Sequence, residues 1–93
     1  MFVGIVRIEL HIPGATSLKE KRSVIQSLKE RIRQRVRAAV AEVDHQDLWQ
    51  RAALGVAVVS GESRQVDERL QSIRQLVHAT HGADLIDWQE QRL

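Results

Sequence analysis

The 93-residue sequence predicts an α+β fold, a ferredoxin-like βαββαβ sandwich in which a four-stranded antiparallel sheet carries two helices on one face. Segments with the alternation of strands and segments with helical periodicity follow one another in the order β-α-β-β-α-β. Apolar residues make up 43% of the chain and charged residues 28%, as in ordinary globular proteins. This length allows one core, so residues 1–93 are expected to form a single domain.

The first half of the chain predicts a strand and a long helix. Residues 2–12 alternate, with Val6, Ile8 and Leu10 on one face, and Pro13-Gly14 ends the strand. Residues 17–36 predict the helix, because apolar residues recur at spacings of three, four and seven. These residues are Leu18, Ile25, Leu28, Ile32 and Val36. Ser17 and Glu20 have the spacing of a capping box at its start.

The second half repeats this pattern. Residues 38–44 and 52–60 predict two strands, joined by a connection of some seven residues from His45 to Arg51. The strand at 52–60 is almost entirely apolar, which places it in the interior of the sheet. A second helix at 63–80 and a polar last strand at 83–91 complete the order.

One face of such a sheet is open, because both helices cover the other. Its polar and partly exposed apolar side chains make it a candidate surface for packing against a second copy. The side chains expected there are Val3, Ile5, Arg7, Glu9, His11 and, depending on register, Glu42 and Asp44.

The composition limits the possible chemistry and location. No cysteine is present, which excludes disulfides, thiolate catalysis and cysteine zinc sites. The apolar runs are too short to cross a bilayer. The sequence opens on strand-like residues rather than on a secretory signal, so we expect a cytoplasmic protein with no membrane partner.

Basic charge is concentrated near the start of the chain. Residues 1–37 hold nine Arg or Lys against three Asp or Glu, whereas residues 38–93 hold five against nine. A local basic patch attracts anionic partners. A general preference for arginine, with eleven Arg and three Lys, is the alternative cause, and the helix face would then be only solvated.

RNA is the partner that this charge favours. The chain has only Phe2, Trp49 and Trp88 as aromatic residues, so its sheet lacks the stacking aromatics of RNA-recognition sheets. Contact with the phosphate backbone through the first helix is therefore expected in place of base reading. The residues predicted to make these contacts are Lys19, Lys21, Arg22, Lys29, Arg33 and Arg37.

Metal binding has two candidate sets of residues. His78 and His81 share the last turn of the second helix near Asp84, although histidines there also interact well with the helix C-terminus. The other set could converge only if the strands align suitably. It consists of His11, Asp44, His45 and Asp47.

Catalysis has little support in the sequence. The loop from Pro13 to Ser17 holds one glycine before a helix start with nearby cations, which is a weak anion-binding signal. Ser17 lies near Lys19, but its capping role is a sufficient explanation, and no glycine-rich nucleophile elbow is present. We therefore expect no enzyme activity, no cofactor and no metal.

Leu48 and Trp49 lie in the connection between the strands predicted at 38–44 and 52–60. Three placements are open for this pair. It folds back onto the edge of the domain, packs across a homodimer, or forms a hot spot for a partner.

Three segments in series resemble the YlxP-like family of small bacterial proteins of unknown function. They are residues 3–14, 17–22 and 41–52, and the likeness extends over essentially the whole chain. The resemblance implies a ferredoxin-like fold and no established activity. Genes of that family often lie near genes for translation initiation and ribosome maturation, which suggests a ribosome-associated role by context. The alternative expectation is a homo-oligomeric regulatory module that uses the open sheet face and the Trp49 connection.

Overall fold

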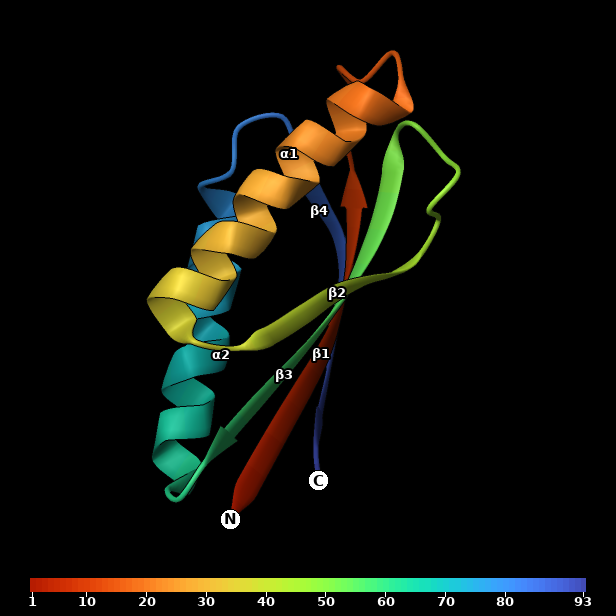
Figure 1. The fold of residues 1–93 in the computed structure, drawn as a ribbon. Helices are drawn as coiled ribbons and strands as arrows, with labels where there is room; N and C mark the ends of the chain where they lie inside the picture. Colours follow the sequence, from red (N-terminus) through yellow and green to blue (C-terminus); the bar gives the residue numbers. More distant parts are fainter.

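The computed structural model, which describes residues 1–93, confirms the predicted ferredoxin-like arrangement. The strands form one antiparallel sheet in the order β2-β3-β1-β4, and both helices lie on one side of it (Figure 1). Its elements are β1 (Phe2–His11), α1 (Leu18–Arg31), the π-helical turn η1 (Ile32–Val36), β2 (Ala39–Asp44), β3 (Arg51–Ser60), α2 (Ser63–His78) and β4 (Asp84–Arg92).

The two most apolar strands, β1 and β3, occupy the centre of the sheet. They pair without interruption from Phe2 opposite Ser60 to His11 opposite Arg51. Even-numbered side chains from Val6 to Leu10 and from Ala52 to Val58 face the helices and are buried, as Ile8 and Leu54 are. A Cβ atom on Gly4 would lie 2.6 Å from Val66 Cγ1, so this glycine lets α2 pack directly on β1.

The start of α1 is fixed by two capping residues. The Ser17 hydroxyl accepts a hydrogen bond from the Glu20 N–H, which confirms the predicted cap. The Glu20 carboxylate accepts from the N–H and the hydroxyl of Thr16, one residue earlier than a standard capping box places it. These two bonds, the backbone bond first, lower the pKa of Glu20 below its ordinary value.

An irregularity in β2 corrects one expectation about the open face. The register between β2 and β3 shifts between Glu42 and Asp44. Glu42 pairs with the buried Leu54 and therefore points toward the helices, whereas Asp44 lies on the open face next to Arg7. Without the irregularity, strand alternation would place Glu42 and Asp44 on the same face. The extra residue, Val43, puts them on opposite faces.

The end of the first helix also departs from a regular α-helix. Residues 32–36 form the π-helical turn η1, with Ile32 and Val36 still buried. Arg37 then ends the helix in the left-handed conformation, with φ of 57°.

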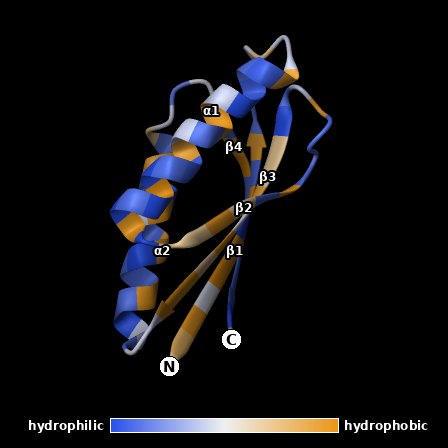
Figure 2. Ribbon diagram, in the orientation of Figure 1, coloured by the Kyte–Doolittle hydropathy of each residue, from blue (hydrophilic) through white to orange (hydrophobic).

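Hydropathy follows this architecture. The central strands carry long hydrophobic stretches, and hydrophilic residues dominate the visible turns of both helices (Figure 2). Neither helix is long and apolar enough to span a bilayer.

Candidate functional site

A row of basic side chains runs along the flank of α1 that borders β2. We call Lys19, Arg22, Lys29 and Arg33 the basic ridge. The first three line a shallow groove of about 440 Å³, together with Gln26 and Glu42. Three of the eight basic residues from Lys19 to Arg37 therefore share one accessible groove.

Most cations of the ridge have no acidic partner within the chain. Lys19, Arg22 and Lys29 take part in none of its ion pairs. Arg33 lies 3.4 Å from Glu30 and also donates to the Val40 carbonyl at 3.2 Å, so it is partly engaged. Arg37, at the end of η1, is exposed and unpaired. Five of the six predicted contact residues are thus accessible to an external anion.

Lys21 is the exception, and its predicted phosphate contact is wrong. Its side chain is 0% exposed. The ammonium group donates to Glu42 Oε2 at 2.9 Å, to the His45 carbonyl at 2.9 Å, and at 3.3 Å to the carbonyls of Gln46 and Arg51. No donor is left for a ligand, because an ammonium has only three protons.

The Lys21 ammonium ties the β2–β3 connection to the first turns of α1. Its partners come from the end of β2, from the connection itself and from the first residue of β3. A signal for this role exists in the sequence. Lys21 lies three residues after Leu18 and four before Ile25, which places it inside the apolar stripe of the helix. A lysine in that stripe needs buried acceptors, and the connection supplies them.

A polar cluster occupies one end of the open face. Glu9 is at its centre, where its two oxygens accept from Arg7 at 2.6 Å and from Arg51 at 2.9 Å. The His45 ring lies 3.2 Å from the same carboxylate, and Arg7 also reaches Asp44. The sequence placed Arg7, Glu9 and Asp44 on this face but did not bring His45 or Arg51 to them.

The cluster keeps both of its carboxylates ionised. Burial raises the pKa of Glu9, but hydrogen bonds from Arg51, Arg7 and His45 outweigh it, so the net pKa is lowered. The pKa of Asp44 is lowered first by the hydrogen bond from the His45 backbone N–H, then by electrostatic interaction with His45 and by the hydrogen bond from Arg7. Two arginines therefore face two carboxylates, and the cluster is internally neutralised.

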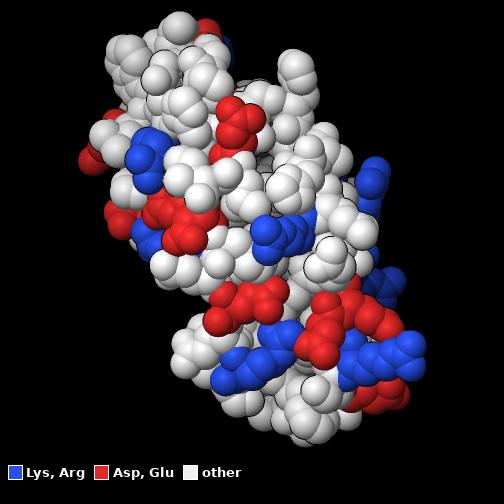
Figure 3. Space-filling view, turned by 180° about the vertical axis from the view of Figure 1, so that it is seen from behind, with Lys and Arg blue, Asp and Glu red and all other residues white.

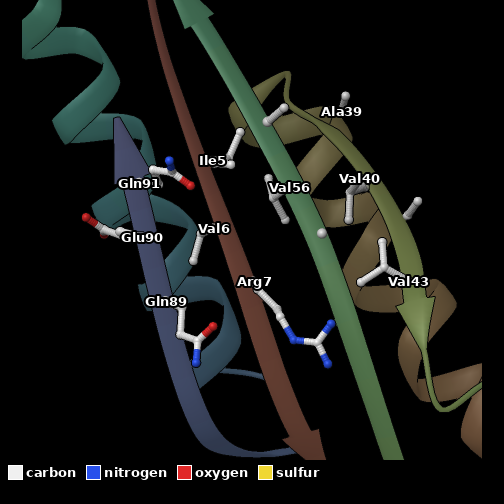
Figure 4. Close-up of a pocket in the computed structure, with 13 residues that line it drawn as sticks. Ile5, Val6, Arg7, Ala39, Val40, Val43, Val56, Gln89, Glu90 and Gln91 are labelled. Carbon is white, nitrogen blue, oxygen red and sulfur yellow. The ribbon is translucent and has the colours of Figure 1, made fainter. Parts of the chain in front are cut away.

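An apolar hollow lies beside this cluster on the open face (Figure 4). Its volume is about 720 Å³. Small residues on β2 and β3, including Ala41, Gly55 and Ala57, line it together with Ile5 and Val43. Val43 also covers Gly55, since a Cβ there would lie 2.8 Å from Val43 Cγ1. Gln89 and Gln91 on β4 complete the rim.

Leu48 and Trp49 project from the β2–β3 connection. Leu48 is 48% exposed and Trp49 is 53% exposed, so about half of each side chain is accessible to a partner. Neither residue lines the hollow on the open face. The open sheet face and the Trp49 connection were expected to form one association surface. Leu48 and Trp49 instead lie outside the apolar hollow of that face.

The structure brings together neither candidate set of metal ligands. No group of three or more His, Asp or Glu side chains has the arrangement of a metal site. His45 is instead held between Glu9 and Asp44 by opposite ring nitrogens. Ser17 serves as the helix cap, and the carbonyls of Pro13 and Ala15 accept from Gln50 Nε2.

The back of the molecule differs from the α1 flank. Seen from behind, Lys and Arg side chains are interspersed with Asp and Glu, and no extended field of one sign is present (Figure 3). Ion pairs of α2 and β4 include Arg64 with Glu68 and Arg92 with Asp67.

Fold and surface together define a small ferredoxin-like α+β protein with a basic helix flank and an open, partly apolar sheet face. A family model described as "Protein of unknown function (DUF503)" matches residues 3–90. The chain therefore belongs to this family of proteins of unknown function.

Two similar proteins agree with this assignment. The uncharacterized protein YlxP of Bacillus subtilis (strain 168) is 35% identical over 71 residues, which are 76% of this chain and 77% of that protein. The resemblance to the YlxP-like family is thus confirmed. A de novo designed protein with a ferredoxin fold matches with a TM-score of 0.57 and 10% identity, over 100% of this chain and 84% of its own. At that identity the likeness concerns the fold alone.

Proposed function

We propose that this protein is a non-enzymatic binding protein that contacts the phosphate backbone of RNA, free or in a ribosomal particle, through the basic ridge. The observation that carries the proposal is the row of Lys19, Arg22 and Lys29, three accessible cations without an acidic partner in the chain. Unpaired cations on one surface are what a polyanion binds by displacing its counterions.

The dimensions of the ridge suit a short stretch of backbone. Lys19 and Lys29 are ten residues apart, which is about 15 Å along an α-helix. Each nucleotide of one strand advances by about 3.4 Å along the axis of a helical nucleic acid, so the ridge can reach several phosphates. Arg33 continues this flank into η1, where it donates to the Val40 carbonyl of β2. Arg37 lies beyond the ridge, in a separate groove with Gln65 and Arg69 of α2. Nothing in this arrangement distinguishes one base from another, so the expected contact is with the backbone.

The proposal is tested by measuring RNA affinity as a function of salt. The double variant Arg22→Gln/Lys29→Gln removes two ridge cations, and Arg64→Gln/Arg74→Gln removes two cations of α2 as a matched control. Fluorescence anisotropy with a labelled RNA gives log Kd against log salt. The ridge variant should lower the slope by about 1.4, at about 0.7 for each lost phosphate contact with a single strand. The control should keep the slope of the unmodified protein.

Two results would reject the proposal. One is the absence of RNA binding by the unmodified protein at low salt. The other is an equal loss of slope in both double variants, because net charge alone would then explain the attraction.

A second candidate function, a homo-oligomeric module, is favoured by the apolar hollow. All four strands contribute to one continuous open face, and a standard interface buries roughly 800 Å² on each partner. The α1 ridge lies on the other side of the sheet, and two copies could therefore approach through neutral surfaces. Ala57→Glu would place a charge in the hollow, and Ala79→Glu adds the same charge on an exposed residue after α2. Light scattering should find a dimer that only Ala57→Glu converts to monomers, and a monomeric unmodified protein would reject this candidate.

A further inference from the structure

The two tryptophans of the chain have different surroundings. Trp88 packs partly against the core, donates its Nε1–H to Glu90 at 2.9 Å, and lies under the Arg74 guanidinium at 5.2 Å. Trp49 is 53% exposed and makes no hydrogen bond through its indole. A half-exposed indole leaves a large apolar face in water, and such faces are typical of contact sites for aromatic or apolar partners.

The segment that carries Trp49 is fixed at both ends. Lys21 holds the carbonyls of His45, Gln46 and Arg51, and it stabilises the connection from the helix side. The backbone of Gln50 accepts from the Ile12 N–H at 2.9 Å, and its side chain donates to the Ala15 carbonyl at 3.1 Å. A ligand that stacks on Trp49 therefore finds a loop that is already ordered, and binding costs less conformational entropy.

The fixed loop lies at the end of α1 where the basic ridge begins (Figure 1). Trp49 is two residues before Arg51, whose carbonyl is 3.3 Å from Lys21 Nζ, and two residues extend over about 7 Å at most. Lys21 in turn stands between Lys19 and Arg22 in the first turns of α1. An exposed aromatic ring and the first cations of the ridge thus lie at the same end of α1, where one nucleic-acid strand can contact both.

We propose that Trp49 stacks on an unpaired base of the RNA strand whose phosphates lie on the basic ridge, so that the ligand is single-stranded or carries an unpaired nucleotide. This inference rests on the proposed function. In a duplex the faces of the bases are covered by their neighbours, whereas an unpaired base offers a free face that stacks on an indole without regard to sequence. Asp47 in the same loop disfavours a phosphate at its tip, which leaves the ring as the contact and places the phosphates on α1.

The experiment compares a short unstructured RNA oligonucleotide with a duplex of the same length at one salt concentration. Trp49→Ala should weaken binding of the single strand by about 5- to 150-fold, the range that loss of one base–aromatic stack produces. It should leave both the duplex affinity and the salt slope unchanged, because no cation is removed. Trp49→Phe, which keeps a stacking ring, should retain most of the affinity, and Leu48→Ala serves as the control on the same loop.

The possible failures are distinguishable. If Trp49→Ala leaves single-strand binding intact, or weakens the duplex equally, the stacking inference is wrong while the ridge proposal stands. If Trp49→Ala changes the molecular mass in light scattering and not the RNA affinity, the loop is a protein interface and the inference is also wrong. If the unmodified protein binds neither RNA, both the inference and the proposed function fail.

Discussion

The two helices pack on the same side of one sheet and use their basic side chains in opposite ways. On α2 every arginine has a partner within the chain. Arg64 pairs with Glu68, Arg69 donates to the carbonyls of Val36, Arg37 and Val59, and Arg74 lies over Trp88. On α1 only Lys21 and Arg31 are fully engaged, the first by the β2–β3 connection and the second by Thr80 and its own helix.

This difference shows that the number of basic residues does not define a binding surface. What defines it is the number of cations left after internal partners are counted. By that measure the arginines of α2 stabilise the fold, whereas α1 leaves cations free to bind a partner. The substitutions below test whether the internal partners stabilise the fold as this distinction requires, beginning with the largest expected effect.

Lys21→Met should lower the free energy of unfolding by about 3–5 kcal/mol. The change leaves the Glu42 carboxylate without its cation and removes the hydrogen bonds to the loop carbonyls, and breaking a buried ion pair has a cost of that size. Lys19→Met on the exposed flank should change it by less than about 0.5 kcal/mol. Urea unfolding of both variants measures the contrast, and similar values would remove the distinction between the two lysines.

Arg69→Met should lower the free energy of unfolding by about 2 kcal/mol. Three carbonyls, at the end of η1 and in β3, would lose a charged hydrogen-bond donor. Arg64→Met removes only an exposed ion pair on the same helix and should cost less than about 1 kcal/mol. Thermal unfolding of the two variants tests this. A larger loss for Arg64→Met would mean that the charge pairs of α2, and not the carbonyl contacts, stabilise it.

Substitutions at the N-caps of the two helices should change the free energy of unfolding in opposite directions. Ser17→Ala should cost about 1 kcal/mol, since it removes the cap of α1. At the start of α2, Glu62 occupies the N-cap position in an extended conformation and its side chain makes no cap hydrogen bond. Glu62→Asp should therefore stabilise the protein by up to about 1 kcal/mol. Denaturant midpoints report both, and destabilisation by Glu62→Asp would contradict the assignment of that cap.

The smallest expected effect is on the stability of the protein at low pH. The folded-state pKa of Glu20 is lowered by Thr16, so its contribution to stability is present above the unfolded pKa of about 4.3 and is lost as the pH falls through the folded pKa. The free energy of unfolding of Glu20→Gln should consequently decline less than that of the unmodified protein between pH 6 and pH 3. Parallel pH profiles for the two proteins would show that the Thr16 contacts contribute nothing.

Much of the fold follows from periodicity. The alternation of residues 2–12 and the apolar run at 52–60 predicted the two central strands, and helical spacing predicted both helices. These patterns suffice because each element must bury one face. They do not contain the bulge at Val43, which depends on pairing between strands, and for that reason Glu42 was placed on the wrong face.

The candidate site was only partly predictable for a similar reason. The ridge follows from the angular positions of Lys19, Arg22, Lys29 and Arg33 on one helix, which the sequence specifies. The cluster around Glu9 depends on Arg51 and His45, which reach it through the sheet and a loop, and contacts of that kind are set by tertiary packing. Lys21 was assigned to the surface by its charge, although its spacing within the apolar stripe indicated burial.

The burial of Lys21 also allows opening of the structure around it to be followed by chemical labelling. The chain has three lysines, and Lys19 and Lys29 stand on the ridge while Lys21 is enclosed. Amine-reactive labelling of the native protein should therefore modify two lysines and spare the third. The slow appearance of label on Lys21 would then time the opening of the β2–β3 connection, without any engineered probe.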